Sequence, residues 1–165
     1  MTLGIAGYKG QGTWIDAVTR TALSIRHRTS VPYSHVELLP HPPIPLSATS
    51  ETLVQRSLAA SKRDGNKVRF KKDLIFKKGN WDFVDLRVSN DEAHRIWSEA
   101  ISLIDTPYDM WGAALCITPL ARLSLDKEWC SGLIADIADW PNPEFYDPYM
   151  VMKKAITLGG ELVVG

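Results

Sequence analysis

The amino-acid sequence predicts an α+β fold built as one domain, residues 1–165. The chain has 165 residues, which is long enough to bury one good core but short for two. Its middle third reads mostly as strands separated by turn-forming residues. Segments with apolar residues at helical spacing precede and follow that region. These observations together favour a sheet packed against helices.

The composition excludes several classes of protein. Nineteen basic residues balance nineteen acidic residues, so the formal net charge is zero. This balance argues against a surface built as a whole for nucleic acid, and we expect no nucleic-acid partner. With 45% hydrophobic residues and six Trp, the composition is also not that of a disordered or fibrous chain.

The N-terminus and the cysteines indicate where the protein is made. The first residues lack the basic start and apolar run of a signal peptide, and no apolar run approaches the ~18 residues of a spanning helix. We therefore expect a soluble chain, cytoplasmic as synthesised. Two cysteines, Cys116 and Cys130, are too few for a disulfide framework. Free thiols are expected, although one bridge between them stays open.

No cofactor is expected from the motifs. Cys and His do not occur at zinc-ligand spacing, and neither a phosphate-binding glycine-rich loop nor a dinucleotide fingerprint is present. The expectation is a protein without metal or nucleotide.

The first third of the chain predicts one helix and one strand. Apolar residues recur at helical spacing from Thr13 to Arg28. Residues 33–39 form a short, partly β-branched run that carries His35 and Glu37, and a cluster of prolines between Pro40 and Pro45 ends it. This run predicts a buried strand followed by a loop.

The middle third predicts three strands. Residues 52–58 and 67–76 flank the turn-forming residues Asp64, Gly65 and Asn66, and residues 81–88 form a further strand.

The last part of the chain predicts mostly helices. Asn90 followed by Asp91 and Glu92 has the chemistry of a helix start, and the apolar face continues until Pro107. Further helices are expected over residues 110–117, before Pro119, and over residues 129–140, which place Cys130 in a first turn. Residues 149–158 are weakly helical, and the final GGELVVG forms a strand or stays loose.

A basic stretch runs from Lys62 to Lys78 and holds eight Lys or Arg residues against two Asp. The favoured interpretation is a solvated hairpin face at a sheet edge. The alternative is contact with an anionic polymer or lipid headgroup.

Cys130 is the candidate nucleophile, because a helix N-terminus and a nearby imidazolium both stabilise a thiolate. His35 could supply the imidazolium if the fold brings its strand to that helix. Glu37, two residues along the same strand, would project to the same face as His35. The sequence alone also allows Cys130 to be a small buried hydrophobe and His35 to be a structural hydrogen-bonding residue. Cys116 keeps the first of these interpretations, and His27, His41 and His94 have weaker claims to chemistry.

A family resemblance shifts this balance. The block EWCSGLIADIAD resembles the nucleophile motif of papain-like cell-wall peptidases of the NlpC type. Here SHVELL precedes WCSGL, an order similar to the circularly permuted branch, which also includes the lecithin:retinol acyltransferase group. LVQRSLAASKRDGNKVRF, WDFVDLRV and TPYDMWGAAL resemble further segments of that branch, so the likeness runs from Tyr33 to Trp140.

The resemblance implies a fold and a site. It implies a permuted papain-like domain with an antiparallel sheet of five or six strands packed against helices. Cys130 carries over as the nucleophile, His35 as its base and Glu37 as the group that orients the imidazole. The backbone N–H of Cys130 would meet the oxyanion.

The function that the resemblance implies is a cysteine hydrolase, an amidase or peptidase acting through an acyl-enzyme on bacterial cell-wall peptide. A lipid acyltransferase or thioesterase of the same fold is the alternative within enzymes. A non-enzymatic binding module is the alternative outside them. Because no signal peptide is expected, a virion-associated or phage-encoded product, or one released by lysis, would explain access to a cell wall.

Overall fold

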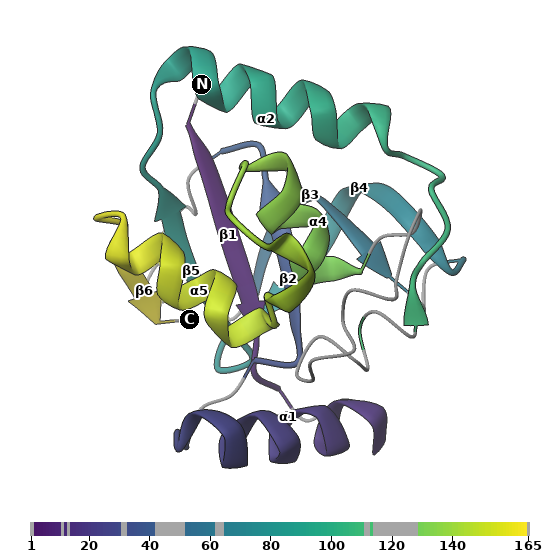
Figure 1. Ribbon diagram of the computed structural model, residues 1–165, viewed down its shortest axis with the longest axis vertical. Helices are drawn as coiled ribbons and strands as arrows, with labels where there is room; N and C mark the ends of the chain where they lie inside the picture. The colour runs from purple at the N-terminus through teal and green to yellow at the C-terminus, as the bar shows by residue number, and fades with distance from the viewer. Residues whose placement is uncertain are drawn as a thin grey trace.

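A six-stranded antiparallel sheet forms the centre of the fold, in the order β4-β3-β2-β1-β5-β6 (Figure 1). The computed structural model describes residues 2–10, 12, 14–30, 33–41, 52–61, 65–110, 113 and 129–164. The α+β class and the antiparallel sheet are thereby confirmed. The strands are β1 Leu3–Tyr8, β2 His35–Leu39, β3 Thr52–Ser61, β4 Lys67–Lys77, β5 Trp81–Leu86 and β6 Leu162–Val164.

The central strand β1 is absent from the sequence-based expectations. It pairs with β2 on one side and with β5 on the other, and its residues up to Gly7 are buried. Two glycines in LGIAGY lower its strand propensity, which hides it from a pattern search. Gly7 has a packing reason: a Cβ there would lie 2.7 Å from the Tyr33 ring and 3.0 Å from Met152.

Strands β3 and β4 form a long hairpin that extends the two predicted strands to Ser61 and Lys77. At its turn, Gly65 and Asn66 have positive φ angles of 92° and 59°, which suits these residue types. In contrast, β2 meets β3 at one registered pair, Leu38 with Leu58. The two strands therefore diverge toward the start of β2.

Helices α2 (Asn90–Ser102), α4 (Cys130–Ile137) and α5 (Pro148–Thr157) pack on one face of the sheet (Figure 1). A short 3-10 helix, η2 (Pro143–Phe145), links α4 to α5. The main core lies between this layer and the sheet and includes Leu3, Ile5, Leu38, Leu58, Ile96, Leu133, Ile134 and Met152. A smaller cluster on the opposite face holds Leu39, Phe76, Trp81 and Phe83.

Helix α2 begins at Asn90, as predicted, but ends earlier than expected. Its N-cap is Ser89, whose hydroxyl accepts a hydrogen bond from the backbone N–H of Glu92 at 3.2 Å. The helix ends at Ser102 instead of continuing to Pro107, because the next segment turns toward β4. There the N–H of Val68 donates to Thr106, and the N–H of Tyr108 donates to Asn66. These hydrogen bonds to the start of β4 replace the backbone hydrogen bonds that a longer α2 would make.

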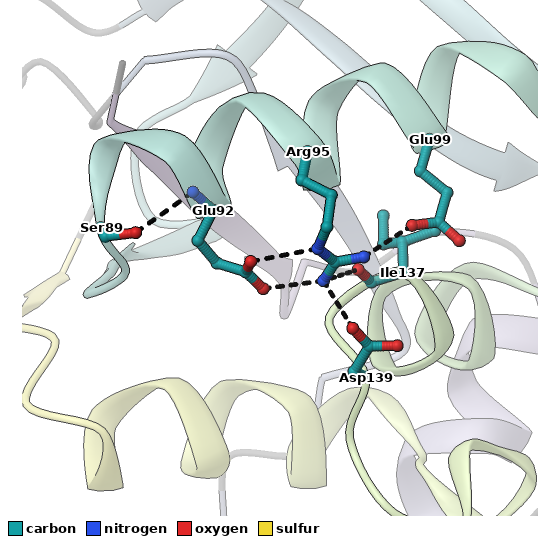
Figure 2. A network of polar contacts seen from close by, with 6 residues as sticks. All are labelled: Ser89, Glu92, Arg95, Glu99, Ile137 and Asp139. Carbon is teal, nitrogen blue, oxygen red and sulfur yellow. Dashed lines mark hydrogen bonds and ion pairs between the residues drawn. The ribbon is translucent and has the colours of Figure 1, made fainter.

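Arg95 fastens α2 to the C-terminal end of α4 (Figure 2). Its guanidinium binds Glu92 and Glu99 on its own helix, reaches Asp139 at 2.8 Å, and donates to the carbonyl of Ile137 at 3.0 Å. A cation at a helix C-terminus also complements the helix dipole. This contact fixes the end of α4 that lies away from Cys130.

Helix α1 (Trp14–His27), close to the expected 13–28, lies at one end of the sheet (Figure 1). Its last turn is held by Asp147, the N-cap of α5, which is fully buried. The imidazole of His27 lies 2.7 Å from an oxygen of that carboxylate, and Arg26 lies 3.3 Å from it.

The remaining elements follow the predictions closely, with three shorter spans. The strand expected over 33–39 begins at His35, the strand expected over 81–88 ends at Leu86, and the helix expected over 129–140 spans Cys130–Ile137. Several predictions lie outside the described residues: most of the 110–117 helix with Pro119 and Cys116, the prolines beyond His41, and positions 62–64 of the basic stretch. None of the helices in the described ranges has the length and apolar character needed to cross a membrane.

Candidate active site

Cys130 is the first residue of α4 and is 5% exposed. The preceding residue, Trp129, has an extended backbone and offers no side-chain cap to the helix. Helices α2 and α5, by comparison, are capped by Ser89 and Asp147. The sulfur therefore lies at the positive dipole end of α4, where no side-chain cap occupies the first-turn N–H groups.

Trp129 and Gly132 determine how this first turn packs. A Cβ on Gly132 would lie 2.5 Å from the Trp129 ring, so the absence of a side chain there allows the indole to cover the turn. The indole N–H donates to the carbonyl of Tyr146 at 3.3 Å. In the WCSG sequence, packing of Trp129 on Gly132 therefore holds the residue before the cysteine against the first turn of the helix.

His35 is the first residue of β2 and lies beside Cys130. Its Nε2 is 3.0 Å from Oε1 of Glu37, which leaves Nδ1 for the hydrogen bond between the ring and the sulfur of Cys130. The backbone N–H of Val36 also donates to that sulfur.

Glu37 contacts His35 on the side away from the sulfur and is 1% exposed. Arg69 of β4 binds it in a bidentate ion pair, with NH1 2.8 Å from Oε2 and NH2 2.6 Å from Oε1. The guanidinium is itself buried and lies 3.4 Å from the hydroxyl of Ser57. One carboxylate therefore holds both the imidazole and a fixed cation.

Arg69 is the part of the site that sequence reasoning missed. It lies within the Lys62–Lys78 stretch, where the favoured interpretation was a solvated face. One signal was available: Arg69 is the only arginine from Lys67 to Lys78, among lysines, and arginine is the residue suited to a buried bidentate pair.

The electrostatics favour a thiolate–imidazolium pair. Burial by itself raises the pKa of the Cys130 thiol, but the charge of His35, its hydrogen bond and the N–H of Val36 outweigh burial and hold that pKa below its usual value. Burial by itself lowers the pKa of His35, yet the adjacent thiolate and Glu37 raise it to about 10. Both shifts favour the form in which the sulfur is negative and the imidazole positive over the neutral pair.

The carboxyl group of Glu37 stays ionised at neutral pH. Burial by itself would raise its pKa, but His35 and Arg69 lower it from 4.5 to about 2. Because the folded-state pKa is depressed, the carboxylate stabilises the fold above pH 4.5, and this contribution is lost as the pH falls toward 2.

The structure thus brings together all three residues singled out from the sequence, Cys130, His35 and Glu37, although ninety-five positions separate His35 from Cys130. The arrangement has the parts needed for nucleophilic catalysis: a stabilised thiolate, a proton carrier in contact with it, and a group that orients the carrier. The other histidines lie elsewhere, His27 against Asp147 and His41 and His94 exposed. Within the described ranges, no group of three His, Cys, Asp or Glu residues is arranged to hold a metal ion.

Comparison of the chain with protein-family models gives no match, and no curated protein or solved structure matches it either.

Proposed function

We propose that this protein is a cysteine hydrolase that cleaves an amide bond through an acyl-enzyme on Cys130. The observation that carries the proposal is the series in which the partly exposed His35 lies between the buried Cys130 sulfur and the buried Glu37 carboxylate. Arg69 completes it by fixing Glu37 from the far side. The permuted papain-like identity of the domain belongs to the same proposal and depends on the SHVEL and WCSGL blocks.

The chemistry begins with the thiolate of Cys130. Its sulfur attacks the carbonyl carbon of the substrate and forms a C–S bond, and the carbonyl electron pair moves onto oxygen. The N–H of Cys130 at the start of α4 would donate to that oxyanion. The imidazolium of His35 then gives its proton to the amine as the C–N bond breaks, which leaves an S-acyl enzyme and a neutral imidazole.

Hydrolysis reverses the roles. Neutral His35 removes a proton from water, the resulting hydroxide attacks the thioester, and the C–S bond breaks to give the carboxylic acid and the thiolate. His35 is again an imidazolium. Throughout, Glu37 holds the ring through Nε2 and directs Nδ1 to the sulfur, while Arg69 keeps Glu37 ionised and in place.

Peptides of the bacterial cell wall are the proposed substrate class, on the strength of the family resemblance. The test incubates the parent protein with isolated peptidoglycan and with its soluble stem peptides, and follows new amino groups and fragment masses. Cys130→Ala should abolish release, whereas Cys116→Ala should retain it. Full activity in Cys130→Ala on any substrate found would disprove the mechanism.

Acyl transfer or thioester hydrolysis on lipids is a second candidate. The observation that favours it is an exposed surface on β3 and β4 that is both aliphatic and basic. Short-chain and long-chain acyl thioesters, assayed beside the wall peptides, separate the two substrate classes. A non-enzymatic binding module would act on neither, and its Cys130 would react with alkylating agents no faster than an ordinary thiol.

A further inference from the structure

Two aliphatic side chains lie exposed and side by side on the β3–β4 hairpin. Val54 and Ile75 are directly opposite each other in the register and are 54% and 55% exposed. Side chains opposite each other in an antiparallel pair project to the same face. The neighbouring pair, Leu53 with Phe76, projects to the other face, where Phe76 is fully buried. Val54 and Ile75 therefore form a small apolar surface that the rest of the described chain does not cover.

Basic residues flank this pair on both sides. Lys77 is exposed and follows Ile75 by two positions on β4, opposite Thr52, so it projects to the same face. On the other side the register shifts between Gln55 and Ser57, so Lys72 and Asp73 both face Arg56 across a β-bulge. Arg56, Lys72 and Asp73 are all exposed. Three cations thus surround the aliphatic pair against one carboxylate, although the whole chain has a net charge of zero.

We propose that this surface, formed by Val54, Ile75, Arg56, Lys72 and Lys77 and termed the hairpin platform, docks on an anionic membrane surface. An anionic lipid layer offers headgroups to the cations and an acyl boundary to the aliphatic side chains. The long stems of Lys and Arg can extend their charges to the headgroups while Val54 and Ile75 enter the interface. A soluble anionic polymer satisfies only the charges and leaves the aliphatic pair in water.

Ser57, three residues along β3 from Val54, projects to the opposite face of the hairpin and contacts Arg69 there. The hairpin platform is therefore separate from the Glu37–Arg69 pair. The inference does not require Cys130 to be catalytic, because the hairpin platform is formed by other residues.

Co-sedimentation with vesicles tests the inference. The parent protein should pellet with vesicles of phosphatidylglycerol and phosphatidylcholine, stay in solution with phosphatidylcholine alone, and dissociate as salt is raised. Two double variants test the aliphatic pair and the cations separately. Val54→Thr with Ile75→Thr removes the aliphatic surface and keeps β-branched residues in the strands, and Lys72→Glu with Lys77→Glu reverses two of the charges. Each should weaken binding about tenfold or more. All positions are exposed, and thermal melts verify that the variants remain folded.

A matched control comes from α1, where Val18 and Ile25 are 60% and 75% exposed. Val18→Thr with Ile25→Thr removes comparable aliphatic surface and should leave vesicle binding unchanged. No binding of the parent to anionic vesicles would overturn the inference. So would loss of binding only in the α1 variant. Retention of binding in the Val54/Ile75 variant, with equal binding of soluble polyphosphate, would instead identify a purely electrostatic polymer site and equally overturn it.

Discussion

Replacing Arg69 by methionine removes the cation that holds Glu37 while keeping a long side chain in the same place. Two hydrogen bonds, of 2.8 and 2.6 Å, are lost, and a carboxylate that is 1% exposed keeps only His35 as its described charged partner. Breaking a buried ion pair from one side costs about 3–5 kcal/mol. The lowered pKa of Glu37 has the same two causes, the contacts with His35 and with Arg69, so only part of it is lost with the guanidinium. We therefore expect Arg69→Met to lose about 3 kcal/mol in free energy of unfolding.

Urea unfolding at pH 7 measures this loss, and a double-mutant cycle assigns it. Glu37→Gln in the Arg69→Met background removes the stranded charge, so the double variant should be more stable than Arg69→Met alone. Acid titration gives a second readout. Because burial raises the pKa of Glu37 once Arg69 is absent, Arg69→Met should begin to lose stability at a higher pH than the parent.

Two results would refute this reasoning. One is an unfolding free energy of Arg69→Met within about 0.5 kcal/mol of the parent, the range expected of ordinary surface substitutions. The other is additivity in the cycle, with Glu37→Gln costing as much in the Arg69→Met background as in the parent. Either would mean that Arg69 lies in a solvated position and does not hold the carboxylate.

Three further substitutions test the supports of Cys130. Gly132→Ala places a Cβ 2.5 Å from the Trp129 ring; we expect a loss of about 1–3 kcal/mol in urea unfolding and slower alkylation of Cys130, and a fully reactive, stable variant would count against the packing. Asp147→Ala removes a fully buried helix cap that also binds α1; a loss of at least about 2 kcal/mol is expected by thermal unfolding, and a loss below about 0.5 kcal/mol would contradict it. Arg95→Ala should cost only about 1 kcal/mol, since its side chain is 37% exposed, and a loss above about 3 kcal/mol would show that its contacts are stronger than surface ion pairs.

Most elements of this fold could be predicted because their patterns are local. The helix after Ser89 and the hairpin around Gly65 and Asn66 follow from residue periodicity and turn chemistry. Strand β1 could not be predicted, because Gly4 and Gly7 weaken its propensity and its position is determined by tertiary packing. The glycine at position 7 is explained only by Tyr33 and Met152, which pack against it from elsewhere in the chain.

The candidate site divides in the same way. Cys130 at a helix start, and His35 with Glu37 on one strand, could be predicted from spacing, and the resemblance suggested that they meet. Arg69 depends on the register that brings β4 beside β3 and on the divergence of β2 from β3, and neither is written in a local pattern. Seven other basic residues share its stretch of sequence, so the pattern indicates a solvated face and hides the buried guanidinium.

The rate of alkylation of Cys130 against pH tests the central claim most directly, read by peptide mass spectrometry with Cys116 as an internal reference. In the parent, the thiolate should be present well below pH 7, so the rate should stay nearly constant through neutral pH. In His35→Ala the thiol returns to the ordinary value of about 8.5 or above, and only about one molecule in 100 is a thiolate at pH 6.5.

The greater nucleophilicity of a more basic thiolate offsets part of that factor, so the rate at pH 6.5 should fall several-fold in His35→Ala. The account predicts this fall together with the loss of the plateau. Equal, slow reaction of Cys130 and Cys116 in both proteins, rising together toward alkaline pH, would contradict it.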